Sequence, residues 1–113
     1  MAVSTSLTAQ LNIKHPIMLA GMGRTSGAPL AAAVTNAGGL GVIGGQLKEM
    51  IFELKGLLDD PNAPFGVDLL LPQVGAGARK TNIDYTKGDL DTLISTIIDG
   101  GAKSLRLRRR CSA

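Results

Sequence analysis

Few side chains in this sequence could take part in acid–base, metal or nucleophilic chemistry. The chain has 113 residues, with one histidine, His15, and one cysteine, Cys111. His15 could act as a general base, but it precedes the first apolar segment and is followed by Pro16, so we expect a structural or exposed histidine. Cys111 has basic neighbours that favour a thiolate. It lies in a tail that we expect to be disordered, and we regard it as incidental.

The charged clusters offer equally little chemistry. The pairs Asp59-Asp60 and Asp89/Asp91 lie at expected helix ends with no histidine nearby, so no metal site is predicted. The arginines of the segment 106–110 could neutralise phosphates. However, aromatic residues make up only 3% of the chain and no helix-turn-helix or zinc-ligand spacing accompanies them. We therefore expect a solvated basic tail and no nucleic-acid partner.

Glycine turns that follow apolar segments are the more informative feature. Residues 16–20 are apolar and lead into Gly21-Met22-Gly23, and residues 40–45 and 65–71 form two further apolar runs. None of the three runs alternates apolar with polar residues. Continuous apolar strands are typical of a parallel sheet, because helices cover both of its faces.

Helical patterns separate and follow these runs. Pro29 suits a first helical turn, apolar positions then recur up to Ala37, and Gly38 suits a left-handed C-terminal cap. Two further segments carry apolar stripes at helical spacing. The first stripe is Leu47, Met50, Ile51, Leu54, Leu57 and Leu58, and the second is Leu90, Leu93, Ile94, Ile97 and Ile98.

The resulting β-α-β-α-β-α order predicts an α/β fold with right-handed crossovers and parallel strands. A fourth strand should begin after Lys103, but the arginines that follow suit a strand buried on both faces poorly, because an unpaired buried charge is costly. We therefore divide the chain into an ordered part, residues 1–103, and a basic tail, residues 104–113, expected to be disordered.

Composition supports one globular domain at most. Hydrophobic residues make up 44% and charged residues 19%, with a mean hydropathy of +0.19, which argues against a disordered chain. Residues 1–103 carry eight basic and nine acidic side chains, so the net charge of +3 comes from the tail. With no apolar run near bilayer length and no signal-peptide pattern, we expect a soluble cytoplasmic protein with no membrane partner.

Several of these segments resemble one enzyme family. The His15–Gly23 opening, the 30–44 segment with Asn36-Ala-Gly-Gly-Leu-Gly, and the 65–71 strand are similar to the nitronate monooxygenases, formerly 2-nitropropane dioxygenases. The likeness covers roughly residues 10–103, and residues 73–87 resemble a long loop of that family. The resemblance implies a partial FMN-dependent (β/α)8 TIM barrel of about three βα units.

The resemblance also implies a cofactor site. The family contacts FMN with the segment equivalent to Gly21, Met22 and Gly23, at the end of a strand where barrel enzymes place their chemistry. Glycines there let the backbone approach a flat ring. Asp68 lies where family members often have an asparagine that contacts the flavin. The family's catalytic histidine and its phosphate-binding loops come from later strands, so no catalytic residue is expected in this chain.

The implied activity is oxidation of an alkyl nitronate with O₂, through FMN, to a carbonyl compound and nitrite. The expected partners are therefore the small nitronate and O₂, and Lys80 could steer the anion, although it is expected to be an exposed loop lysine.

Two alternatives remain open, because a complete barrel needs about 250 residues. The chain would then be the N-terminal part of such an enzyme, and it could be a non-catalytic fragment that associates with another chain, or with itself, through its open sheet edge. The other alternative is a related FMN-barrel enzyme, an enoyl reductase or one similar to inosine-monophosphate dehydrogenase.

Overall fold

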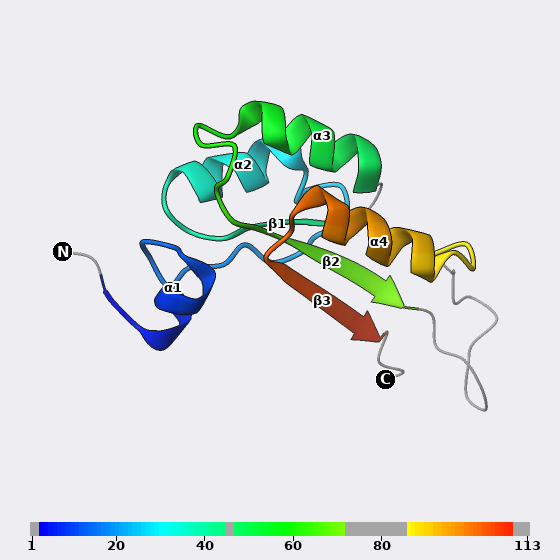
Figure 1. Cartoon of the computed structure of the whole chain (residues 1–113), viewed down its shortest axis with the longest axis horizontal. Helices are drawn as coiled ribbons and strands as arrows, with labels where there is room; N and C mark the ends of the chain where they lie inside the picture. The colour runs from blue at the N-terminus through cyan, green and yellow to red at the C-terminus, as the bar shows by residue number, and fades with distance from the viewer. Residues whose placement is uncertain (1–2, 45–46, 72–85, 110–113) are drawn as a thin grey trace.

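The computed structural model describes residues 3–44, 47–71 and 86–109. Its elements are α1 (Ser6–Leu11), α2 (Ala28–Asn36), β1 (Gly41–Gly44), α3 (Leu47–Leu57), β2 (Phe65–Leu71), α4 (Leu90–Gly100) and β3 (Ser104–Arg109). The strands form one parallel sheet in the order β1-β2-β3. Helices α2, α3 and α4 gather on one face of this sheet, and α1 lies apart from them (Figure 1). The expected α/β fold with parallel strands is confirmed.

The first expected strand, residues 16–20, is reduced to a short parallel contact with the start of β1. Met18 bridges Leu40, and two backbone hydrogen bonds flank the bridge, from Leu19 N to Leu40 O and from Leu40 N to Ile17 O, both 2.9 Å long. Pro16 has no N–H to extend the ladder. Beyond Leu19 the chain leaves β1 and packs against β2 at Gly21. The segment therefore occupies the position of a strand with little regular pairing.

Strand β1 is apolar on both faces because both of its faces are covered. Neighbouring Val42 and Ile43 point to opposite sides of β1, yet both are buried. Ile43 joins the main core beneath the helices, whereas Val42 packs with Leu40 and Ile13, the latter from the segment that follows α1. The continuous apolar pattern seen in the sequence reflects these two separate contacts.

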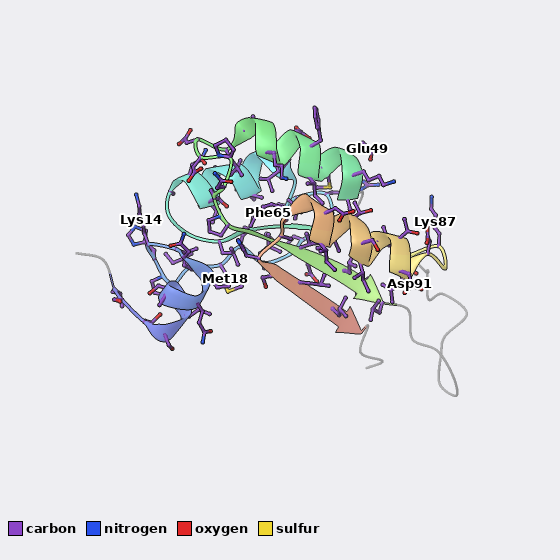
Figure 2. The ribbon with its side chains drawn as sticks, viewed as in Figure 1. Lys14, Met18, Glu49, Phe65, Lys87 and Asp91 are labelled. Carbon is purple, nitrogen blue, oxygen red and sulfur yellow. The ribbon has the colours of Figure 1, made fainter. Side chains whose placement is uncertain are left out.

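The main core lies between the sheet and the three helices. In Figure 2, Phe65 lies at the start of β2 beneath the helices, while Glu49 and Asp91 are carried on α3 and α4 at the periphery. The predicted stripe of α3 is largely confirmed, since Leu47, Ile51 and Leu54 are buried. The stripe of α4 is covered less well, because only Ile97 is buried and Ile98 is 69% exposed.

Strand β3 corrects the expectation that residues 104–113 are a disordered tail, for the part up to Arg109. Ser104–Arg109 pairs in parallel with β2, with Asp68 opposite Arg106 in register. The expectation was wrong because it assumed burial on both faces. Within the described residues β3 has only β2 as a strand neighbour, and Leu105 and Leu107 are exposed. An edge strand of this kind tolerates charged residues.

Two helix features complete the comparison with the sequence. The expected left-handed cap is confirmed at Gly38, with φ +97°, and Gly101 ends α4 in the same conformation, with φ +80°. Helix α1 was not predicted; it begins with a reciprocal capping box between Thr5 and Thr8. No helix within the described ranges is long and apolar enough to cross a membrane.

Candidate functional site

The candidate site is a loop at the carboxyl-terminal edge of the parallel sheet. The loop, residues 20–27, leaves the segment beside β1 and leads into α2. Gly44, the last residue of β1, and Asp68, its register partner on β2, lie at the same edge. In barrel enzymes this edge holds the catalytic machinery, whereas the opposite edge serves stability.

The structure brings together two of the residues predicted from the sequence, Gly21 and Asp68. A Cβ built on Gly21 would lie 2.1 Å from Asp68 Oδ2 and 2.3 Å from Asp68 Cβ. Such distances are far inside van der Waals contact, so only glycine allows this approach. The loop therefore rests directly on the side chain of Asp68, which is only 7% exposed.

Hydrogen bonds within the loop keep it compact. Ser26 N donates to Met22 O at 2.7 Å, and Thr25 N donates to Gly23 O at 2.9 Å. The Ser26 hydroxyl donates to the carbonyl of Val42 on β1. Arg24 takes a left-handed conformation, with φ +66°, at the tip of the turn. The loop is thus attached to β1 through Ser26 and packed on β2 through Gly21.

Between these two attachment points the loop is accessible. Met22 is 40% exposed, and Gly23 and Arg24 are exposed. A Cβ built on Gly23 would meet no heavy atom within 4 Å, so its backbone borders open space. A flat ligand could approach this backbone without meeting a side chain at that position. The predicted residues Gly21, Met22, Gly23 and Asp68 therefore lie at one edge, with Gly21 and Asp68 in contact.

The other residues considered from the sequence lie elsewhere. His15 is half-buried, and its N–H donates to Gly38 O at 3.0 Å, next to the start of β1. It is therefore separated from the loop by the length of β1. Lys80, most of the 73–87 segment and Cys111 lie outside the described residues. Among the residues that are described, no group of three acidic, histidine or cysteine side chains could hold a metal ion.

Ser26 is the residue of this site that sequence reasoning missed. Its side chain is fully buried, although it lies in a polar stretch, Arg24-Thr25-Ser26. A serine in such a stretch normally indicates an exposed loop, so no pattern marked it. Its position two residues before the start of α2 was the only available signal.

Comparisons with known proteins agree with this geometry. The sequence profile of the family described as nitronate monooxygenase matches residues 4–98. A probable nitronate monooxygenase from Staphylococcus saprophyticus is 41% identical over 78 residues, covering 64% of this chain and 21% of that protein. The (3aS,4S,5R,7aS)-5-hydroxy-7a-methyl-1-oxo-octahydro-1H-indene-4-carboxyl-CoA dehydrogenase of Mycobacterium tuberculosis is 36% identical over 85 residues, covering 70% of this chain and 23% of that protein.

The solved structure of FabK from Thermotoga maritima is similar in fold, with a TM-score of 0.69 and 33% identity, covering 93% of this chain and 30% of that chain. The chain therefore spans less than a quarter of the two curated relatives described above and about a third of FabK. The parallel sheet with helices on one face is a partial (β/α)8 barrel. Because the family profile covers most of the sequence, the chain belongs to the nitronate monooxygenase family.

Proposed function

We propose that this chain provides the Gly21–Gly23 edge of an FMN site in an oxidoreductase of the nitronate monooxygenase type. Family membership supports an oxidoreductase, and the family is generally flavin-dependent. The observation that carries the proposal is the bare backbone at Gly23, beside a loop packed on Asp68 at the carboxyl-terminal edge. Bound FMN would supply the electron-accepting chemistry for oxidation of an alkyl nitronate by O₂ to a carbonyl compound and nitrite.

The residues at this edge fit a flat aromatic group. Gly23 leaves room for a ring to lie against the backbone, and Met22 offers a flexible, polarisable side chain beside it. Asp68 belongs to the proposed site because its carboxylate lies against Gly21 and so sets the height of the loop above the sheet. The part of this chain in the reaction would be to bind and orient the cofactor.

A direct test measures FMN binding by visible absorbance and by quenching of flavin fluorescence. Gly23→Ala should weaken FMN binding about tenfold, because a methyl group would occupy the space that the ring needs. Gly56→Ala is the matched control, since a Cβ there also meets nothing within 4 Å but lies on α3, away from the site. Equal FMN binding by both variants would contradict the proposed site.

The second candidate function is that of a related FMN-barrel reductase or dehydrogenase. The relative from M. tuberculosis is named a dehydrogenase, and the fold is similar to that of FabK, so the same edge could serve a different substrate. Nitrite release from propionate 3-nitronate in the presence of O₂ separates these candidates. FMN binding together with nitrite release would favour the nitronate monooxygenase over the reductase or dehydrogenase.

A third candidate is a fragment that has no activity and associates through its sheet edge. Leu105 and Leu107 on β3 are exposed, together with Ile98 on α4. Self-association would cover these apolar side chains. Colourless, oligomeric protein in size-exclusion chromatography, with no nitrite release, would support this candidate over both enzyme functions.

A further inference from the structure

The Ser26 side chain is the one polar group of the loop that is completely buried. Its exposed fraction is 0%, and its hydroxyl donates a hydrogen bond to the Val42 carbonyl inside strand β1. A buried hydroxyl is costly to keep unless it is hydrogen-bonded, so this contact decides where the loop can lie.

Ser26 and Gly21 hold opposite ends of the exposed turn. Gly21 packs against Asp68 on β2, and Ser26 is bonded to β1 sixteen residues further along the chain. The backbone bond from Ser26 N to Met22 O closes the turn between them. The exposed residues 22–25 are therefore fixed at both ends to neighbouring strands of one sheet.

We infer that Ser26 is a positioning residue that holds the Met22–Thr25 turn in the conformation that a ligand meets. A turn that is already ordered does not lose conformational freedom when a ligand binds, so its ligand affinity is higher. That the ligand is FMN rests on the proposed function. The ordering of the turn by Ser26 does not depend on it.

The chain offers a matched control in Thr35, another buried residue whose hydroxyl is hydrogen-bonded. Its Oγ1 accepts from Gly41 N at 2.9 Å and donates to Pro64 O at 3.4 Å. These contacts lie where β1 and β2 begin, at the opposite end of the sheet from the loop. Ser26→Ala and Thr35→Val each remove one buried hydroxyl, but only the first removes it from the loop.

The test is amide hydrogen exchange of the full chain, followed at the N–H groups of residues 25 and 26, which bond within the turn. Ser26→Ala should speed exchange at these two amides about tenfold relative to the amides of β1 and β2. Thr35→Val should leave exchange at residues 25 and 26 unchanged relative to the amides of β2, while the Gly41 amide, which loses its acceptor, should exchange faster. Ser26→Cys, with a similar size and a weaker donor, should give an intermediate rate.

Two results would overturn the inference: unchanged exchange at residues 25 and 26 in Ser26→Ala, or an equal rise throughout β1 and β2. The second result would make Ser26 a general stabilising residue. A parallel FMN titration separates this inference from the proposed function. If the unsubstituted chain binds no FMN while Ser26→Ala loosens the turn, the FMN site is wrong and the positioning role stands. If FMN binds and Ser26→Ala changes neither exchange nor affinity, the positioning role is wrong.

Discussion

Glycines lie at both edges of the sheet beside β1, with Gly39 and Gly41 at its start and Gly23 in the loop at the carboxyl-terminal edge. The two groups differ in what surrounds them. At the amino-terminal end, a Cβ on Gly41 would lie 2.0 Å from the Ala31 carbonyl oxygen of α2, and one on Gly39 would lie 2.9 Å from the Ile17 carbonyl oxygen. At the carboxyl-terminal end, a Cβ on Gly23 would meet nothing within 4 Å. The first group lets helix and strand pack closely, and the second leaves a surface open.

The difference shows how one residue type can allow close packing at one edge and leave the backbone open at the other. The Asn36–Gly41 motif resembles the family as much as the Gly21–Gly23 loop does, yet its contacts are internal. Asn36 even bonds the end of α3, through Leu57 O and Asp59 N, each at 3.0 Å. We therefore expect variants in the Asn36–Gly41 motif to change mainly the free energy of unfolding. Gly23→Ala, in the loop, should change mainly ligand affinity.

The largest expected loss of stability is for Gly41→Ala. The added methyl group would collide with backbone atoms of α2, which cannot move without displacing the helix. We expect the free energy of unfolding to fall by more than about 3 kcal/mol. Chemical denaturation measures this change, and Gly56→Ala in exposed α3 should instead be neutral or slightly stabilising. If Gly41→Ala had the same free energy of unfolding as the unsubstituted protein, the close packing of α2 on β1 would be contradicted.

Gly21→Ala should cost about 2 kcal/mol, because its methyl group would overlap the side chain of Asp68. A double-mutant cycle sharpens the assignment. Asp68→Gly in the Gly21→Ala background should recover part of the loss, whereas Asp68→Ala should recover little, because Asp68 Cβ itself lies 2.3 Å from the added methyl. Equal recovery by both would place the conflict at the carboxylate of Asp68 instead of its Cβ, and no recovery by either would place it elsewhere.

Asn36→Ala should reduce stability by about 1 kcal/mol, because two hydrogen bonds at the end of α3 are lost on an exposed surface. FMN affinity of the folded protein should not change. A drop in affinity as large as that of Gly23→Ala would show that the two edges are not independent.

Gly23→Ala should change the free energy of unfolding by no more than about 0.5 kcal/mol, because the position is exposed and no left-handed backbone conformation requires glycine there. Thermal denaturation without FMN tests this. Combined with weaker FMN binding, this result would identify Gly23 as a residue kept for the ligand. A large loss of stability would show that Gly23, like Gly39 and Gly41, is needed for packing.

The smallest effect is expected for His15→Ala. Its described hydrogen bond uses the backbone N–H, which the variant keeps, and the side chain lies at the edge opposite the proposed site. FMN affinity should therefore be unchanged, as a fluorescence titration can verify. A large loss of affinity would overturn the division between the two edges.

Much of the fold could be predicted from residue patterns within single segments of the sequence. The apolar runs at 40–45 and 65–71 and the stripe of α3 predicted the elements, because a strand or helix buried between layers must be apolar where it is covered. The prediction of a disordered tail failed because coverage depends on other parts of the molecule: β3 forms a strand despite its arginines, since it lies at the edge of the described sheet. The predicted helix is confirmed as α4, although Ile98 of its apolar stripe is exposed.

The candidate site could likewise be predicted only in part from the sequence. Gly21, Met22, Gly23 and Asp68 could be named from the sequence through a family resemblance, since strand ends of a parallel sheet meet at one edge. The contact between Gly21 and Asp68, 47 positions apart, and the burial of Ser26 could not, because both depend on how the loop folds back over neighbouring strands. Local patterns in the sequence determined five of the described elements, α2, β1, α3, β2 and α4. Packing between elements decided which glycine is enclosed and which borders open space, since distances between remote residues exist only once the sheet has assembled.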